Sequence, residues 1–262
     1  MNKKHLITCS VIMVLFIVSQ LFICSTNFKR KAVSFRTTSV ESTTSISTYI
    51  KYNKDANNDI NFADESLPIN NVKVAKKLKR SLYQHSFSCI QSNVLHKKAE
   101  KLFPVIEPIL KYYGIPEDFK YIPLVESGLC EGTSSRGARG LWQFMPGTAR
   151  TYGLKVNSSK DERLNLRKST IAACKYLVEL HQEFKSWTLT AAAYNLGSIK
   201  LQKAINRSKK HNYFLIHLNA ETGSYVYKLI AMKEVISKPE AYGYKNAYAW
   251  LKPSKELTVT GS

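Results

Sequence analysis

From residue 68 onward, apolar residues recur at intervals of three and four, and this periodicity constrains the fold more than any other feature of the chain. The segments NNVKVAKKLKRSLYQHSF and SNVLHKKAEKLFPVIEPILKYYG both follow it, as amphipathic helices do. Later segments, including WTLTAAAYNLG and TGSYVYKLIAMKEVIS, are also helical in pattern. No convincing alternation of apolar and polar residues indicates a strand. We therefore predict a single all-α domain over residues 67–250.

The N-terminus has the layout of an export signal or a membrane anchor. Lys3 and Lys4 precede a mostly apolar run from Leu6 to Cys24, and a basic start before such a run is typical of both kinds of segment. We predict a signal peptide or membrane anchor over residues 1–26. Residues 27–66 are rich in Ser, Thr and Asn, which predicts a flexible tether, and residues 251–262 are predicted to be a tail.

The chain is strongly basic, with 39 Lys and Arg against 19 Asp and Glu and a net charge of +20. This charge fits either a well-hydrated surface or a polyanionic partner, such as nucleic acid, anionic lipid or an acidic cell-wall polymer. The export layout counts against nucleic acid. We therefore predict a protein of the cell envelope, either membrane-anchored or periplasmic, that binds no nucleic acid.

Cysteine spacing and common motifs indicate no metal or cofactor. Cys9 and Cys24 lie in the apolar run, which leaves Cys89, Cys130 and Cys174. Three cysteines allow at most one disulfide, and none has the paired C-x-x-C spacing of a zinc site. The chain also lacks H-E-x-x-H, P-loop and G-x-G-x-x-G motifs, so we predict neither a metal nor a cofactor.

A single carboxylate lies in the mostly apolar stretch FKYIPLVESGL, and it is the first candidate for chemistry. On a helix, Phe119, Ile122, Glu126 and Leu129 share one stripe. Burial would raise the pKa of Glu126 and keep it protonated near neutral pH, as a general acid requires. A glutamate that caps a loop, or that pairs with Arg136 or Arg139, would be the structural alternative.

A glycine-punctuated loop follows, in the stretch GTSSRGARGLWQFMPGTARTYGL. Its glycines allow the backbone to approach a ligand closely. Gln143 places an uncharged hydrogen-bonding group among Trp142, Phe144 and Met145, which is typical chemistry for a sugar site. A short helix should follow, entered at Pro146 and stopped at Gly153.

Four separated segments resemble, in order, the motifs of the soluble-lytic-transglycosylase (SLT) domain family. They are ESGLCEGTSSRGARGLWQFMPGTARTYGL, DERLNLRKSTIAACKYL, AAAYNLGSIKLQKAI and AETGSYVYKLIAMKEVI. The resemblance covers residues 67–244 and is strongest to the membrane-bound murein transglycosylase D group. It implies a lysozyme-like α-domain that cleaves the MurNAc–GlcNAc bond of peptidoglycan without a cofactor.

The resemblance also implies roles for individual residues. Glu126 matches the family's sole catalytic acid/base, and Tyr225 matches the tyrosine that hydrogen-bonds it. The positions that match substrate-binding residues are Ser134 (or Ser135), Gln143, Met145, Tyr194, Asn195 and Tyr225. The family needs one carboxylate because the substrate's acetamido group assists, and the product carries a 1,6-anhydro end.

Two departures from the family pattern lie close to these residues. Cys130 and Glu131 replace the usual Asn-Pro, and Leu196 stands where a small residue is common. Hydrolysis, as in goose-type lysozymes, and glycan binding without catalysis are the alternative functions. We predict a monomer whose partners are glycan strands and, through the N-terminal segment, a membrane.

Overall fold

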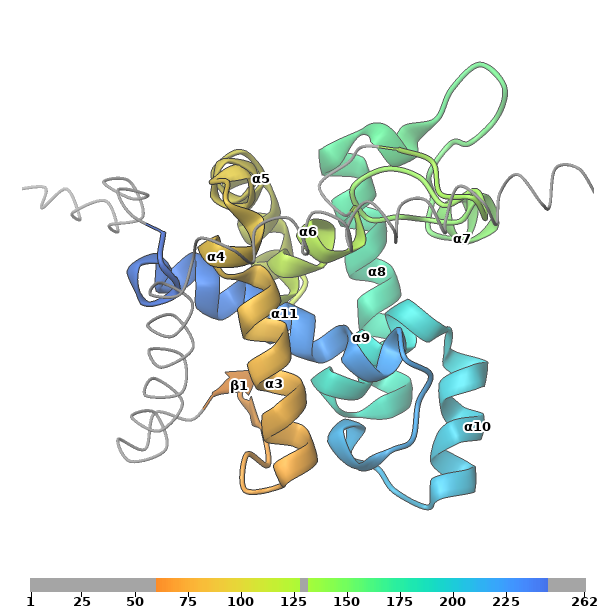
Figure 1. Ribbon diagram of the computed structural model, residues 1–262. Helices are drawn as coiled ribbons and strands as arrows, with labels where there is room; N and C mark the ends of the chain where they lie inside the picture. The colour runs from red at the N-terminus through yellow and green to blue at the C-terminus, as the bar shows by residue number, and fades with distance from the viewer. Residues whose placement is uncertain (1–59, 128–131, 245–262) are drawn as a thin grey trace, which may run out of the picture. The chain divides into compact units, whose positions relative to one another are not determined.

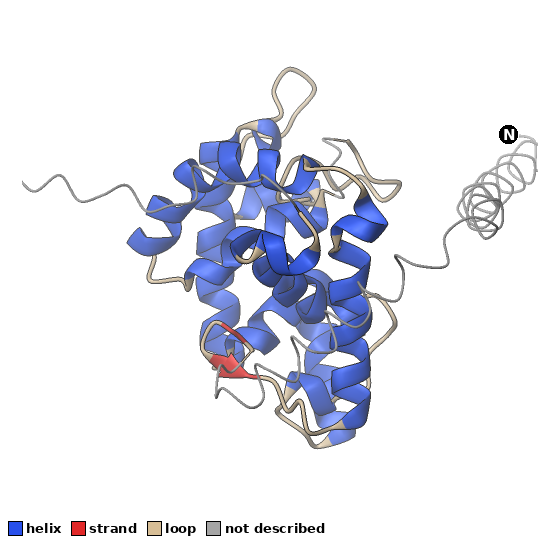
Figure 2. Ribbon diagram, turned by 60° about the vertical axis from the view of Figure 1, so that its left-hand side comes forward, coloured by secondary structure: helices blue, strands red, loops and turns tan. Residues whose placement is uncertain are grey.

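The computed structural model describes residues 60–127 and 132–244 of the chain. These residues are mostly helical (Figure 2), which confirms the predicted helical character. The α-helices are α3 (Val72–His85), α4 (Phe87–Ile90), α5 (Val94–Tyr112), α6 (Ile122–Glu126), α7 (Pro146–Thr151), α8 (Leu166–Phe184), α9 (Trp187–Leu196), α10 (Ser198–Ser208) and α11 (Thr222–Ser237). Single 3-10 turns are η1 (Glu117–Tyr121), η2 (Glu162–Leu164), η3 (Tyr213–Leu215) and η4 (Pro239–Tyr242).

Helix α11 is the central element of the folded region. Its buried residues occur on every side of the helix, including Val226, Leu229, Ile230 and Val235. A helix that is apolar all round must be enclosed by other elements. Helices α3, α5, α6 and α9 and the turn η1 all pack against it (Figure 1). Because α11 also carries Tyr225, the packing of the core determines where that tyrosine lies.

A small hairpin precedes the helices and corrects one predicted boundary. Strands β1 (Asn61–Phe62) and β2 (Glu65–Ser66) pair antiparallel, and both turn residues between them have positive φ. Ile60 and Phe62 are buried in the core. The predicted tether over residues 27–66 is therefore too long at its C-terminal end, because residues 60–66 belong to the folded region.

The hairpin is attached to the helices by two carboxylates. Glu65 accepts hydrogen bonds from the backbone N–H groups of Trp187 and Thr188, at the positive end of the α9 dipole, where an anion is favourable. Asp118 of η1 accepts a bond from the Ala63 N–H at 2.7 Å and pairs with Lys233 of α11 at 2.6 Å. The hairpin is thus joined to η1 and α9, and Asp118 connects it to α11.

The predicted leader, residues 1–26, and the predicted tail lie outside the described residues. Among helices in the described part of the chain, none is both long enough and apolar enough to cross a membrane. Cys89 is exposed and Cys174 is buried, and both are free thiols. Burial raises the pKa of Cys174 to about 12, so it is a packed, unreactive thiol. Cys130 lies outside the described residues.

Candidate functional site

Glu126 is the last residue of α6, which continues directly from the 3-10 turn η1. Pro123 lies in the first turn of α6. Because proline has no backbone N–H, it cannot continue the bonding of the preceding turn, and the 3-10 turn η1 gives way to α6 here. Phe119 and Ile122 are fully buried beneath it. Helix α6 ends at Glu126, and Leu129, the last residue of the predicted stripe, lies outside the described residues.

The carboxylate of Glu126 has a specific partner on the central helix. The Tyr225 hydroxyl donates a hydrogen bond to Glu126 Oε1 at 2.7 Å, across 99 residues of sequence. Tyr225 is itself buried, and burial together with the nearby Glu126 charge holds its pKa well above 10.0. The phenol therefore remains a donor throughout the neutral range.

The environment of Glu126 favours its protonated form. Burial raises the pKa of the Glu126 carboxyl above its usual range, and the charge of Glu221 raises it further. The Tyr225 bond, the Asn195 amide and the positive charge of Lys228 act in the opposite direction, because each stabilises the carboxylate. Burial is the largest of these effects, so the pKa of the carboxyl lies above its usual range, and the groups beside it would stabilise its anion.

Asn195 connects Glu126 to the start of α11. The Thr222 hydroxyl donates to Asn195 Oδ1 at 2.7 Å, and Asn195 Nδ2 donates to Glu221 Oε1 at 3.3 Å. The first bond orients the amide so that its nitrogen faces the two carboxylates. The AAYN segment predicted from the sequence thus reaches the same site as Glu126.

Tyr194 joins this group to the glycine-punctuated loop. Its hydroxyl donates to the Trp142 carbonyl at 2.7 Å, and its ring lies against Phe144 and Tyr176, with centroids 6.3 Å and 5.5 Å away. The charge of Glu126 contributes to the raised pKa of Tyr194, so the two side chains lie near each other. Trp142 is fully buried, as core packing requires.

The predicted loop residues are held mainly within their own loop. Gln143 has a positive φ of 46° and donates from Nε2 to the Gly140 carbonyl at 2.9 Å and the Gly132 carbonyl at 3.3 Å. Ser134 is exposed, and its Oγ accepts the Ala138 N–H at 3.0 Å. Met145 is 43% exposed at the start of α7. The structure thus forms two groups, one around Glu126 and one in this loop, joined through Tyr194.

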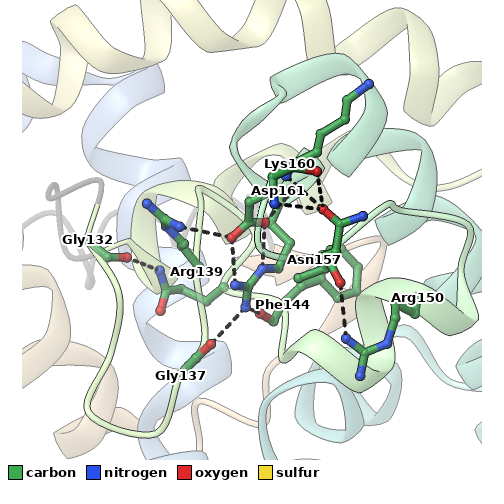
Figure 3. Close-up of polar contacts among 12 residues, drawn as sticks. Gly132, Gly137, Arg139, Phe144, Arg150, Asn157, Lys160 and Asp161 are labelled. Atoms are coloured by element: carbon green, nitrogen blue, oxygen red, sulfur yellow. Dashed lines mark hydrogen bonds and ion pairs between the residues drawn. The ribbon is translucent and has the colours of Figure 1, made fainter.

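Two residues without a predicted role anchor the loop. Arg163 donates from Nη1 to the carbonyls of Gly137 and Phe144, at 2.8 and 3.0 Å. It also binds both carboxylate oxygens of Asp161, at 2.9 and 2.7 Å. Arg139 adds a bond to Asp161 at 3.0 Å (Figure 3). A buried guanidinium with this bidentate partner fixes the loop backbone far more closely than the glycines alone would.

Close packing explains one of the loop glycines. Gly140 has a φ of +80°, and a Cβ at this position would lie 2.1 Å from the Arg163 carbonyl oxygen. The backbone of the loop can approach η2 this closely only without a side chain. Asp161 and Arg163, which form this anchor, lie in the charged segment DERLN. Nothing in the sequence showed that these charges face the loop.

With the geometry established, the chain can be compared with known proteins. A model of the transglycosylase SLT domain matches residues 103–216. The chain belongs to the family of lytic transglycosylase SLT-type proteins.

Two of the relatives have names that belong to this class. Membrane-bound lytic murein transglycosylase D of Escherichia coli (strain K12) is 34% identical over 154 residues, which are 56% of this chain and 34% of that protein. The protein of the same name from Escherichia coli O6:H1 (strain CFT073) gives the same values. A protein of Alteromonas sp. (strain M-1), whose name refers to tributyltin chloride resistance, is 30% identical over 58% of this chain and 77% of its own length. The chain spans about a third of the length of the Escherichia coli relatives.

Proposed function

We propose that this chain is a peptidoglycan lytic transglycosylase, which cleaves the β-1,4 bond between MurNAc and GlcNAc and leaves a 1,6-anhydro end. Family membership supports the class of enzyme, and the names of the Escherichia coli relatives support murein as the substrate. The observation that carries the proposal is the hydrogen bond between Tyr225 and Glu126, at 2.7 Å. It places a carboxyl of raised pKa beside a buried phenol.

In the first step, Glu126 acts as a general acid. Its proton passes to the glycosidic oxygen as the bond from C1 of MurNAc to that oxygen breaks, and the departing GlcNAc keeps the oxygen as a hydroxyl. The substrate's own 2-acetamido oxygen stabilises the positive charge at C1, so a second carboxylate is not needed as a nucleophile. The Tyr225 hydroxyl donates to the new carboxylate and stabilises it.

In the second step, the same Glu126 carboxylate acts as a base. It removes the proton from the C6 hydroxyl of MurNAc, whose oxygen forms a bond to C1. This closes the 1,6-anhydro ring and returns Glu126 to its protonated form. Water would give a reducing end instead, so the aromatic surroundings of Tyr194 and Tyr225 serve to keep it out.

The other predicted residues bind the substrate in this proposal. Ser134 contacts the glycan near the acetamido group, Gln143 donates or accepts bonds to a sugar, and Met145 packs against a sugar face. Asn195 orients the substrate beside Glu126. These roles follow from the family resemblance, and the loop anchored by Arg163 gives the first three a rigid support.

Hydrolysis is the second candidate function, because Glu221 lies close enough to influence the pKa of Glu126. Glu221 is exposed and accepts a bond from Asn195. An ionised carboxylate in this position could activate a water, as the base of an inverting glycosidase does. Its bond to Asn195 and its exposure instead fit a residue that orients the amide.

We also propose a location in the cell envelope. The N-terminal layout of a basic start and an apolar run supports export, and the relatives' names describe membrane-bound proteins. The net charge of +20 favours an acidic polymer such as peptidoglycan. In this proposal the chain is a monomer and binds no nucleic acid.

The test is mass spectrometry of the muropeptides released from purified sacculi by the full-length chain in a non-ionic detergent. We expect anhydro-muropeptides from the wild type and from a Glu100→Gln control, which changes an exposed carboxylate away from the site. Glu126→Gln should release none. Reducing ends that disappear in Glu221→Gln would assign hydrolysis, and sedimentation with sacculi without any product would assign a binding module.

A further inference from the structure

A pocket lies between α3 and the first two turns of α11. Its volume is about 420 Å³, which is in the range of ligand pockets. The residues at positions 218–220 also line it. Helix α3 contributes Lys77, Arg80 and Gln84, which fall on one side of a helix because they are three and four residues apart. The two helices lie against each other (Figure 1).

The pocket is positively charged. Lys77 and Arg80 line it from α3 and Lys228 from α11, and its lining contains no Asp or Glu. None of these three cations takes part in an ion pair among residues 60–127 and 132–244. The first turn of α11 also faces the pocket, at Gly223 and Ser224, so the positive end of the helix dipole adds to the potential.

The pocket also has groups that suit a peptide. Lys77 donates to the Gly223 carbonyl at 3.1 Å and lies 5.6 Å from the centre of the Tyr227 ring. Gln84 and Asn219 offer amides, and Leu218 and Tyr227 offer apolar surface. Backbone amides and short side chains of a peptide could pair with these groups, while its acidic groups meet the cations.

The pocket adjoins the site around Glu126. Lys228 follows Tyr225 by three residues on α11, and its charge acts on the Glu126 carboxylate. Asn219, in the pocket wall, accepts the Thr222 N–H at 2.8 Å, and the Thr222 hydroxyl binds Asn195. These contacts connect the pocket wall to the residues around Glu126.

We infer that this pocket binds the peptide stem of a glycan strand through the stem's carboxylates, while the sugar to which the stem is attached lies at Glu126. The inference rests on the proposed function, because it takes the substrate to be peptidoglycan. The stem carries free carboxylates and amides, which match the three cations and the neutral polar groups of the pocket. The pocket would thus select strands that still carry their peptides.

The test is calorimetric binding of the disaccharide-tetrapeptide GlcNAc-MurNAc-tetrapeptide to the full-length chain in a non-ionic detergent. This ligand contains no MurNAc–GlcNAc bond, so it is not cleaved and its binding can be measured whether or not the chain is an active transglycosylase. The same ligand with its carboxylates amidated, and the disaccharide without peptide, complete the series.

We expect amidation to weaken binding at least about fivefold, and Arg80→Gln to weaken binding of the free-acid ligand by a similar factor, as loss of a charge-assisted contact does. In Arg80→Gln, amidation should then have less effect. The matched control is Lys79→Gln, which removes the same charge from an exposed position about 100° around α3 from Arg80. It should bind like the wild type.

Three results would overturn the inference. Equal affinity for the free-acid and amidated ligands would show that the pocket does not read carboxylates. If Arg80→Gln and Lys79→Gln weakened binding of the free-acid ligand equally, the effect would come from the net charge of the protein and not from the pocket. Displacement by glycerol 3-phosphate at a concentration where acetate does not compete would assign the pocket to a phosphate-bearing partner, such as a lipid headgroup. Loss of glycan cleavage in the separate sacculus assay would affect only the proposed function.

Discussion

Asp161→Asn tests whether the ion pair behind the glycine-punctuated loop holds the site together. The pKa of Asp161 is lowered to about 2, mainly by its hydrogen bonds to Arg163, from about 3.9 in an unfolded chain. Each pKa unit is about 1.4 kcal/mol, which gives at most about 2.6 kcal/mol, and solvent screening near the surface reduces this to about 1–2 kcal/mol. The variant also leaves the guanidinium of Arg163, only 7% exposed, without its counter-charge. We expect a total loss of about 3 kcal/mol at neutral pH.

The pH dependence gives the sign of the effect. Because the folded-state pKa of Asp161 is the lower one, its stabilisation is complete above about pH 4 and is lost as the pH falls toward the folded-state pKa. The difference in unfolding free energy between wild type and Asp161→Asn should therefore shrink across this interval. Urea unfolding of the full-length chain, followed by circular dichroism, measures it.

Two outcomes would refute this reasoning. A difference that stays constant with pH would mean that the charge of Asp161 is not what stabilises the loop. A similar loss in Glu100→Gln, an exposed carboxylate, would mean that removing any acid from this basic chain has the same effect. In Asp161→Asn, glycan cleavage should decrease together with the free energy of unfolding, because the loop that carries Gln143 loses its support.

Three further variants test the site and its packing. Tyr225→Phe removes the donor to Glu126, so we expect kcat to fall about ten- to a hundredfold. Because the Tyr225 bond lowers the pKa of Glu126 in the wild type, its loss should move the alkaline limb of the pH–rate profile to higher pH. A limb that does not move would contradict this. Glu126→Gln should abolish turnover and yet stabilise the fold at neutral pH. The raised folded-state pKa means that wild-type stability falls, relative to the variant, as the pH rises above the unfolded-state value. Urea unfolding that showed no such fall would contradict a raised pKa. Gly140→Ala brings a Cβ to 2.1 Å from the Arg163 oxygen and should cost about 2–4 kcal/mol in thermal unfolding, whereas Gly132→Ala, with open space around it, should cost little.

Periodicity was sufficient to predict the helices, but it did not predict which faces are most tightly packed. On α8 the apolar residues Ile171, Cys174, Val178 and Phe184 lie broadly on one side of the helix. The structure buries Cys174 completely, together with Ala172, Ala173 and Leu177, and leaves the other three partly exposed. Helix α9 has three buried alanines of its own and packs against α8. Small side chains on both helices permit close approach, and residue hydrophobicity alone does not reveal such pairing.

The site was predictable only where a local signal existed. Glu126 was conspicuous because a carboxylate in an apolar run is unusual. Its partner Tyr225 is 99 residues away, and only the family resemblance connected the two. The ion pair of Asp161 and Arg163 joins neighbours in sequence, but its bonds to Gly137 and Phe144 depend on a loop path that the sequence does not specify.

The hairpin also determines how mechanical load enters the folded region. The Glu65 carboxylate receives bonds from Ser186, Trp187 and Thr188 at one end of α9, and the other end of the same helix carries Tyr194 and Asn195. Tension applied to the chain at residue 60 would therefore reach the residues around Glu126 through α9 and, by way of Asp118 and Lys233, through α11. A shortened chain that begins at residue 67 would remove this coupling together with the cap of α9, so residue 60 is the better place to begin a minimal domain.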